Sequence, residues 1–316
     1  MKRVSNNQHS RHGFTIIELL TVMSIIIILI SLLVPSLNRV RRYAMDVKQR
    51  AQLHSIAVAL DLFNSEFEGY PDSNAYDSES LRYCGAMKLA EAMVGQDLKG
   101  FNPTSRFLRR GFPSTLGVLP YIGMPYPPYN TCGGAVDIPC YNENIRSRKM
   151  YLQLENANVY QIKDIYVPTA GGAPTSYNSF EPNTFVLCDS YNRVTHTTTG
   201  KKIGMAILYY KANISMTQHM WQGRNSGQDW NIYDARDNLD LINMGLPWFA
   251  GPSHPMAENG GTISGATATP QVFYDKTRDN KVSGNPWPVR ADSYILMSAG
   301  FDGEYGTNDD IYNFSD

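Results

Sequence analysis

The sequence predicts an α+β protein in which one long N-terminal helix carries an enlarged, β-rich and loop-rich globular head. Residues 14–34 form an unbroken apolar run, and residues 35–68 keep their apolar side chains at helical spacing. The rest of the chain alternates short apolar runs with Pro- and Gly-rich connectors. The 28 basic and 29 acidic residues nearly balance, which argues against a nucleic-acid-binding protein and against a charged, disordered chain.

Residues 14–34 have the length and composition of a membrane-spanning helix. Glu18 is the only charged residue in this run. As a helix the run is about 32 Å long, which matches a hydrocarbon core of roughly 30 Å. A cleavable secretory signal would have a shorter apolar run that ends at a small-residue cleavage site. We therefore expect one transmembrane helix. Basic residues flank it on both sides, so charge alone leaves its orientation open.

The helix is expected to continue beyond the membrane as an amphipathic segment over residues 35–70. Its apolar residues recur every three or four positions, which places them on one face. They are Leu37, Val40, Ala44, Val47, Ala51, Leu53, Ile56, Leu60, Phe63 and Phe67. Pro35 removes a backbone donor and predicts a bend or a local melting of the helix. Gly69-Tyr70-Pro71 predicts its end.

The N-terminus carries the pattern G-F-T-x-x-E after a short basic leader, with Gly13, Phe14 and Glu18 at its defining positions. Together with the apolar run that ends at Pro35, this pattern resembles the class III signal of type IV prepilins and type II secretion pseudopilins. The resemblance implies that a prepilin peptidase removes residues 1–13 by cutting between Gly13 and Phe14, and that the new Phe14 amine is methylated. It also implies a cytoplasmic N-terminus and a periplasmic head at the bacterial inner membrane.

Glu18 is unusual, because a carboxylate inside a span costs roughly 2.5 to 3.5 kcal/mol on insertion scales. Cleavage would create a cationic amine at Phe14. A carboxylate one helical turn away, or on a neighbouring subunit, can neutralise that amine in a low-dielectric bundle. We therefore expect Glu18 to act in assembly, since pairing between chains favours one axial register. A carboxylate that merely reaches the lipid head groups is the alternative.

Residues 291–316 are predicted to form a buried strand, at 294–297, followed by an acidic loop. The loop contains four carboxylates among its glycines: Asp302, Glu304, Asp309 and Asp310. Clustered carboxylates on a Gly-rich loop suit Ca²⁺, although the spacing is not that of an EF-hand. An acidic hairpin that turns at Asp302-Gly303 is the alternative.

The pattern S-A-G-x-D-G-x-x-G-T-x-D-D-I resembles the C-terminal calcium loop of major type II pseudopilins. This resemblance implies a structural Ca²⁺ bound by the side chains of Asp302, Asp309 and Asp310, with Ser298 and the backbone carbonyl of Met297 nearby. The likeness to the family covers only the two ends of the chain, roughly residues 13–73 and 294–314.

Residues 71–290 form the enlarged head, and the sequence indicates no role for it. Strand-like runs occur at 184–187 and 204–210. The four cysteines allow three pairings. We expect Cys132–Cys140 to close a small loop and Cys84 to pair with Cys188, with free buried thiols as the alternative.

We expect no enzymatic activity. The chain lacks the motifs of hydrolases, metalloproteases and phosphate-binding loops. Asp189, Ser190 and His196 are close in sequence, which is poor support for a catalytic triad. The aromatic stretch at 219–234, with Trp221 and Trp230, could form a stacking surface for glycans or secreted proteins, unless both tryptophans lie in the core.

The resemblance favours a structural subunit of a type II secretion filament, close to the major pseudopilin. It implies a helical homopolymer with these partners: the prepilin peptidase, minor pseudopilins, the assembly platform and its ATPase. No nucleic acid is expected. A type IV pilin for adhesion, motility or DNA uptake is one alternative, and a membrane-anchored surface binding module is another.

Overall fold

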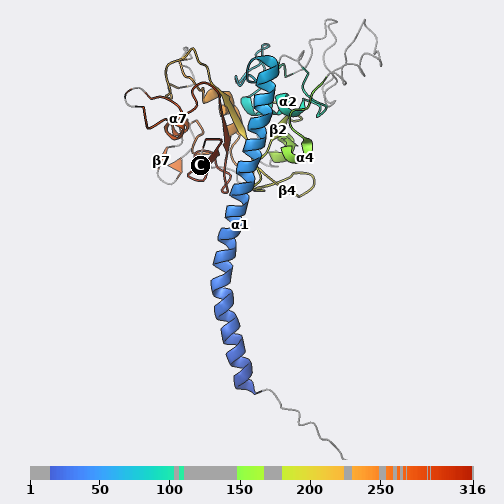
Figure 1. Cartoon of the computed structure of the whole chain (residues 1–316), viewed down its shortest axis with the longest axis vertical. Coiled ribbons are helices and arrows are strands. Elements are labelled where there is room, and N and C mark those ends of the chain that lie inside the picture. The colour runs from blue at the N-terminus through green and yellow to red at the C-terminus, as the bar shows by residue number, and fades with distance from the viewer. Residues whose placement is uncertain are drawn as a thin grey trace, which may run out of the picture. The chain divides into compact units, whose positions relative to one another are not determined.

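The structure is a computed structural model of the 316-residue chain. It describes residues 15–102, 107–109, 148–166, 180–223, 230–248, 254–258, 262–263, 266–267, 269–282, 284 and 286–314. The chain divides into two compact units, Met1–Met45 and Asp46–Asp316. Among the described elements the long helix α1 and several short strands stand out (Figure 1), which confirms the predicted α+β class.

Helix α1 runs from Ile16 to Phe67 (Figure 1), close to the predicted bounds. It is helical throughout, with Pro35 inside it, so the predicted local melting at Pro35 is wrong. A proline inside a helix costs about 3 kcal/mol. Long helical runs on both sides offset that cost, because each added residue contributes a further backbone hydrogen bond.

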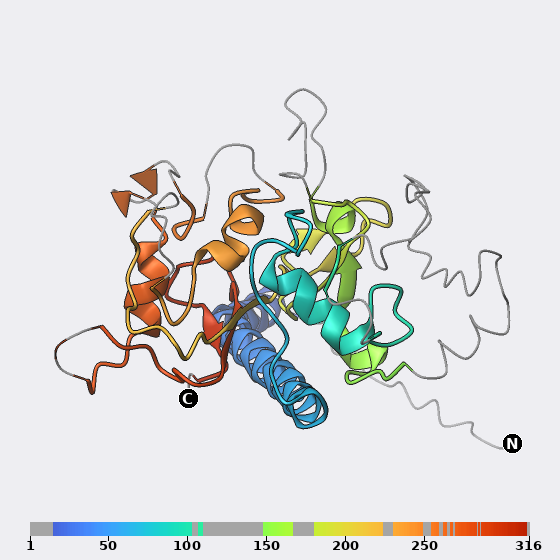
Figure 2. The ribbon, with the colours of Figure 1, turned by 90° about the horizontal axis from the view of Figure 1, so that it is seen from above.

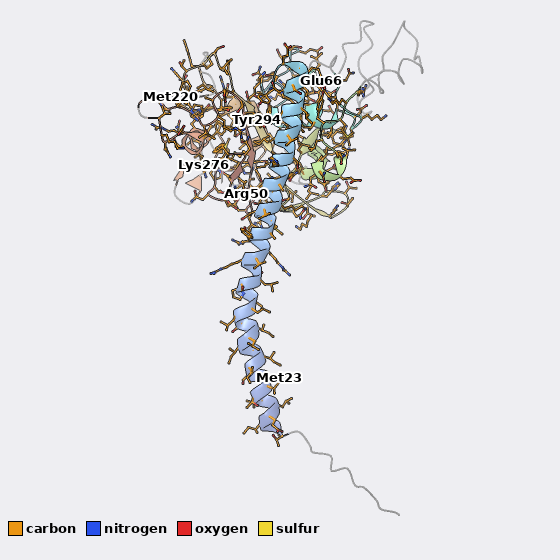
Figure 3. All side chains as sticks on the ribbon, viewed as in Figure 1. Met23, Arg50, Glu66, Met220, Lys276 and Tyr294 are labelled. Atoms are coloured by element: carbon orange, nitrogen blue, oxygen red, sulfur yellow. The ribbon has the colours of Figure 1, made fainter. Side chains whose placement is uncertain are left out.

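The first part of α1, residues 16–34, is apolar on nearly all sides, with Glu18 as its one charged residue. Every described side chain from Thr15 to Ala44 is exposed, and those near Met23 project outward all around the helix (Figure 3). Within the described residues, α1 is the one helix long and apolar enough to cross a membrane, with a mean hydropathy of 2.8 over its most apolar window. A helix that is apolar all round and uncovered by protein has the character of a lipid-embedded segment.

The second half of α1 packs on the head through one face. Its buried apolar residues are Leu53, Ile56, Ala59, Leu60 and Phe63, and the predicted face included all of these except Ala59. The predicted face wrongly included Val47, which is 49% exposed, and Ala51, which is exposed as well. The face of α1 that meets the head begins instead with the polar residues Gln49 and Gln52, which a search for apolar periodicity does not detect.

The head is built from short elements. Among its described residues the helices are α2 (Gly85–Val94), α4 (Leu154–Ala157), α5 (Ile162–Ile165), α6 (Arg236–Ile242) and α7 (Gln271–Thr277). Its strands are β1 (Val159–Gln161), β2 (Phe185–Leu187), β3 (Val194–Thr195), β4 (Lys202–Ile203), β5 (Leu208–Lys211), β6 (Thr262–Ile263), β7 (Ala266–Thr267), β8 (Tyr294–Ser298) and β9 (Ile311–Tyr312). These strands pair in antiparallel fashion.

The three-stranded sheet β5-β8-β9 is the centre of the head. Strand β8 is buried along its whole length, and its observed bounds confirm the strand predicted at 294–297. Helix α7 lies on one side of the second half of α1, and β2 and α4 lie on the other (Figures 1 and 2). Helix α2 is buried on all sides. Its first residue is Gly85 because a Cβ there would lie 2.2 Å from the carbonyl oxygen of Tyr209.

The predicted strand at 184–187 is confirmed as β2, whereas only the end of the predicted 204–210 strand is regular, as part of β5. At Gly204 a Cβ would lie 2.0 Å from the carbonyl oxygen of Asp189. The chain there crosses the end of β2 closely, with one isolated bridge between Cys188 and Ala206.

The predicted Cys84–Cys188 disulfide is wrong. Both residues are buried free thiols in the hydrophobic core. Burial raises the pKa of Cys84 to about 12 and the pKa of Cys188 well above its usual value, so both behave as small apolar side chains. An even number of cysteines cannot distinguish a bridge from two core thiols. Cys132 and Cys140 lie outside the described residues.

Candidate functional sites: the start of α1 and the C-terminal acidic loop

Glu18 forms a capping box with Thr15 at the first turn of α1. Its Oε2 accepts hydrogen bonds from the backbone N–H of Thr15 at 2.9 Å and from the Thr15 hydroxyl at 2.8 Å. In return, the Thr15 Oγ1 accepts a bond from the backbone N–H of Glu18 at 3.3 Å. Two amide donors at the start of the helix are thereby satisfied. The pattern T-x-x-E before an apolar run is the signal that sequence reasoning missed.

Both side-chain bonds of Glu18 use the same oxygen, Oε2. Within the described residues, Oε1 therefore stays available to a cation while the cap is intact. The cap fixes this carboxylate at the helix N-terminus, where the helix dipole favours negative charge. Gly13 and Phe14, the predicted processing residues, lie outside the described residues.

The acidic loop, which we define as residues 300–310, connects β8 to β9. Strands β8 and β9 pair at Met297↔Tyr312 and Ser298↔Ile311, so the loop has a rigid base. Gly300 has φ +66, and a Cβ there would lie 2.2 Å from the carbonyl oxygen of Asp309. The two ends of the loop can approach this closely only because residue 300 is glycine.

Three carboxylates fold the acidic loop onto its own backbone. Asp309 Oδ2 accepts a bond from the N–H of Asp302 at 2.9 Å. Asp302 Oδ1 accepts one from the N–H of Glu304 at 2.8 Å, and Asp310 Oδ2 accepts one from the N–H of Gly306 at 3.0 Å. The loop is therefore ordered by its acidic residues.

The carboxylate of Asp310 is the most deeply buried acid of the loop, with its side chain 0% exposed. Its Oδ1 is buried without a hydrogen bond of normal geometry, and the Tyr312 phenol is a neighbouring group. Burial raises the pKa of Asp310 to about 8 and that of Asp302 to about 6. Both shifts indicate that negative charge in the loop is poorly compensated.

The other predicted calcium ligands have different surroundings. The Ser298 hydroxyl donates to Oδ2 of Asp189 at 3.0 Å. Met297 lies in the central strand, paired with Leu208 on one side and Tyr312 on the other. Within the described part of the chain, no three acidic, histidine or cysteine side chains form a group that could hold a metal ion. The loop has carboxylate oxygens of the kind that bind calcium, but several of these oxygens accept hydrogen bonds from backbone amides. The calcium site therefore stays a prediction.

Comparison with known families settles the nature of the N-terminus. The prokaryotic N-terminal methylation motif matches residues 8–34, which include the end of the predicted leader and the apolar run that enters α1. The N-terminus is a prepilin-type signal. The chain therefore carries the signal that type IV pilin-like proteins and pseudopilins share, which confirms the predicted resemblance. No curated protein and no solved structure matches it significantly.

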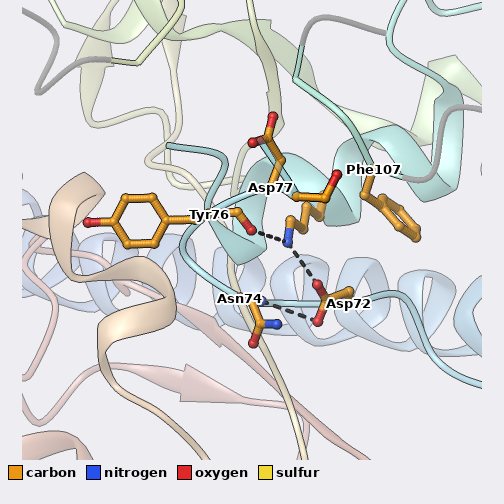
Figure 4. Close-up of a pocket in the computed structure, with 7 residues that line it drawn as sticks. Asp72, Asn74, Tyr76, Asp77 and Phe107 are labelled. Carbon is orange, nitrogen blue, oxygen red and sulfur yellow. Dashed lines mark hydrogen bonds and ion pairs between the residues drawn. The ribbon is translucent and has the colours of Figure 1, made fainter. Parts of the chain in front are cut away.

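The pilin-like protein has a polar pocket of about 250 Å³ beside α2 (Figure 4). Its lining residues are Asp72, Asn74, Tyr76, Asp77, Ser78, Lys88 and Phe107. The buried ammonium of Lys88 donates to Oδ2 of Asp72 at 2.9 Å and to the carbonyl of Tyr76 at 3.0 Å. Asp77 accepts bonds from the amides of Glu79 and Leu81. These polar groups hold the turn between α1 and α2, which is a structural role.

The three residues considered for a catalytic triad have separate partners. Asp189 accepts bonds from Ser298 and from the N–H of Met205. The backbone N–H of Ser190 donates to Gln49. The ring of His196 lies 3.6 Å from the carboxylate of Asp164. Their polar groups thus serve different contacts in the fold.

The two tryptophans of the 219–234 stretch differ. Trp221 packs partly against the core, whereas Trp230 is 44% exposed, so the alternative that both lie in the core is wrong for Trp230. Trp248 and Trp287 are each 37% exposed. The head of this pilin-like protein therefore presents several large aromatic side chains to its surroundings.

Proposed function

We propose that this pilin-like protein is a subunit of a type II secretion filament, that is, a pseudopilin. The observation that supports the proposal is the prepilin-type signal, which continues directly into a long, apolar and uncovered helix. A single helix of this kind anchors the precursor in the inner membrane, with the leader in the cytoplasm and the head in the periplasm. After processing, the same helix becomes the contact between subunits.

Glu18 provides the chemical basis for assembly in this proposal. Removal of residues 1–13 creates a cationic amine at Phe14, next to the capped first turn of α1. The Glu18 carboxylate lies on that turn, with one oxygen used by the cap. Pairing between the carboxylate of one chain and the amine of another neutralises both charges when helices pack side by side. The prepilin peptidase, minor pseudopilins, the assembly platform and its ATPase are the partners that this mechanism requires.

Mass spectrometry of the mature protein tests the processing step. We expect the chain to begin at a methylated Phe14, and we expect Gly13→Val to retain the leader, because the residue before the scissile bond must be small. Gly69→Ala is the matched control, since a Cβ at Gly69 meets nothing within 4 Å. A mature chain that begins at Met1 or after Val34 would refute the proposal.

A type IV pilin with a recognition head is the second candidate. The exposed side chains of Trp230, Trp248 and Trp287 favour it, because exposed aromatic rings can stack on glycans or on protein partners. Electron microscopy separates the two functions. Long filaments that extend beyond the cell indicate a pilus, whereas filaments confined to the cell envelope indicate a secretion pseudopilin.

We also propose that the acidic loop takes one Ca²⁺. Asp302, Asp309 and Asp310 supply hard oxygen ligands of the kind that Ca²⁺ prefers. The buried Oδ1 of Asp310 and the raised pKa values of Asp302 and Asp310 support this assignment, since a cation would relieve both. The bound ion would stabilise the link between β8 and β9.

A further inference from the structure

Lys276 places an ammonium group against the acidic loop. It lies in the last turn of α7 and is labelled in Figure 3. Its Nζ donates a hydrogen bond to the backbone carbonyl of Thr307 and lies 3.6 Å from Oδ2 of Asp310. The Lys276 side chain is 23% exposed, and the Asp310 side chain is fully buried. The contact therefore joins two segments that lie 31 residues apart in the sequence.

The loop itself has no positive charge to offset its acids. Residues 300–310 contain four carboxylates and neither lysine nor arginine. Arg193 approaches the loop at Gly303, but its guanidinium stacks on the ring of Trp248, 5.2 Å from the ring centre. Lys276 instead directs its ammonium at the buried carboxylate of Asp310, with Nζ 3.6 Å from Oδ2. The lysine thus compensates part of the charge that a divalent cation would otherwise balance.

The two oxygens bound by Lys276 are of the kind that a calcium ion needs. A backbone carbonyl and a carboxylate on one Gly-rich loop are hard ligands, and the ammonium is directed at both. An ion that bound these oxygens would lie within a few ångströms of Nζ, where a divalent cation and an ammonium repel by about 2 kcal/mol even in bulk water and by more near a protein surface. The ammonium and the ion therefore exclude each other.

We propose that Lys276 is a built-in competitor for the divalent cation of the acidic loop. The ammonium keeps the loop closed in the metal-free protein, and Ca²⁺ binds only when it displaces Lys276 from Thr307 and Asp310. This inference rests on the proposed calcium site and adds its regulation. The competition raises the calcium concentration at which the site fills, while the loop stays folded below that concentration.

Helix α7 can lose the Lys276 contact and remain in place. Phe273 and Tyr274 belong to the hydrophobic core, and the Thr277 hydroxyl donates to the carbonyl of Phe273 at 2.7 Å and contacts Nε2 of His219 at 2.8 Å. Substitution of Lys276 is therefore expected to leave the fold intact and to change the loop alone.

Calorimetric titration of the full-length mature protein in detergent with CaCl₂ tests the competition. We expect Lys276→Met to lower the Kd for Ca²⁺ at least tenfold, because it retains the length of the side chain and removes the ammonium. Lys276→Arg is expected to stay close to wild type, since it keeps a cation. Lys281→Met is the matched control, because Lys281 is an exposed lysine shortly after α7, and its Kd should lie within twofold of wild type.

The possible outcomes separate this inference from the calcium proposal. If no variant takes up calcium at millimolar concentration, both ideas are overturned. If wild type and Lys276→Met bind with the same Kd, or the variant binds more weakly, the calcium site stands and the competition is overturned. Lys276→Gln provides a second substitution if Lys276→Met does not fold.

Hydrogen exchange of the metal-free protein gives an independent readout. The amides of Asp302 and Gly306 are bonded to Asp309 and Asp310. We expect these amides to be protected in metal-free wild type, to exchange at least tenfold faster in metal-free Lys276→Met, and to regain protection when Ca²⁺ is added. Equal protection in the two metal-free proteins would show that Lys276 does not hold the loop closed.

Discussion

At the first turn of α1, Glu18 combines a structural contact with a charge that remains free to act. The capping box occupies Oε2, and glutamine satisfies the same box as well as glutamate does. The cap alone therefore does not explain why the residue in a membrane span should be charged. The cost of that charge is better explained by a partner, such as the amine that the proposed processing would create at Phe14.

Two substitutions of Glu18 separate the cap from the charge. Glu18→Gln keeps the cap and removes the charge, whereas Glu18→Val removes both. We expect both variants to insert into the membrane and to be processed, and both to give few filaments, because the Phe14 amine then lacks its partner. Quantification of sheared filaments by immunoblot checks this. If Glu18→Gln assembles as well as wild type, the carboxylate acts only as a cap.

His254 is a second residue whose role follows from one hydrogen bond. It is buried, and its Nδ1 accepts a bond from the backbone N–H of Tyr305 at 3.1 Å. Protonation at Nδ1 would turn this acceptor into a donor and break the bond. Burial lowers the pKa of His254 to about 3, against about 6.5 in an unfolded chain. The imidazole is therefore neutral in the folded head, which gives stability that depends on pH.

The sign of that dependence follows from proton uptake. Between pH 6.5 and 3 the unfolded chain protonates His254 and the folded chain does not, so its contribution is complete above pH 6.5 and decreases as the pH falls. By pH 5 the loss is about 2 kcal/mol. Urea unfolding at pH 7.5 and pH 5 should show a smaller loss for His254→Asn, which keeps an acceptor and cannot protonate. Burial raises the pKa of Asp189 to about 7, so this residue makes the folded state more stable as the pH falls. Its effect is the same in wild type and in His254→Asn and cancels in the comparison. Equal losses would contradict the assignment.

At the scale of elements, hydrogen bonds from polar side chains attach the second half of α1 to the head. Gln49 Oε1 accepts a bond from the N–H of Ser190 at 2.8 Å, and Gln52 Nε2 donates to the carbonyl of Cys188 at 2.8 Å. The Tyr191 hydroxyl donates to Oδ1 of Asp46 at 2.6 Å. These bonds lie at the end of β2, where the backbone leaves the sheet. Gln49 and Gln52 thus satisfy two buried backbone groups of the segment that follows β2.

Removal of one of these hydrogen bonds should lower the free energy of unfolding of the head measurably. Gln49→Leu keeps the side-chain volume and leaves the buried N–H of Ser190 without an acceptor, which costs about 1 to 3 kcal/mol. Val58→Ala is the control on the same helix, because Val58 is 48% exposed and its truncation should change the free energy of unfolding by about 0.5 kcal/mol or less. The midpoint of urea unfolding at an unchanged m value reports the difference. An equal midpoint for both variants would show that the hydrogen bond between Gln49 and Ser190 does not stabilise the head.

At the scale of the whole molecule, the boundary between the two units falls inside α1, between Met45 and Asp46. Before this boundary, the described side chains of α1 are exposed up to Ala44. After it, α1 belongs to the same unit as the head. One continuous helix therefore has an uncovered apolar part and a part that packs on the head, which agrees with the proposed role of a subunit that is stored in a membrane and then polymerises.

Calcium is expected to stabilise the whole head if the acidic loop binds it. Binding to the folded state alone adds about 2.7 kcal/mol at a hundredfold excess of ion over Kd, so a chelator should lower the melting temperature of the mature protein. The double change Asp309→Asn and Asp310→Asn should abolish the response, while Glu304→Gln in the same loop should keep it. Processing at Phe14 should be unaffected in all of them. An identical wild-type melt with and without chelator, and no calcium uptake by calorimetry, would favour a plain acidic hairpin.

The sequence by itself determined the parts of this protein that depend on local pattern. The prepilin-type signal, the apolar composition of the span, the helical spacing up to Phe67 and the buried strand β8 are all properties of neighbouring residues, and composition and period report them directly. The capping box of Thr15 and Glu18 is equally local and could have been predicted. Only the tertiary structure decided which distant groups become partners. Gln49 meets Ser190 across 141 positions, Cys84 and Cys188 are core thiols, and Lys276 reaches the acidic loop. The physical reason is that a polar group must find a partner wherever packing buries it, and packing is set by the whole chain.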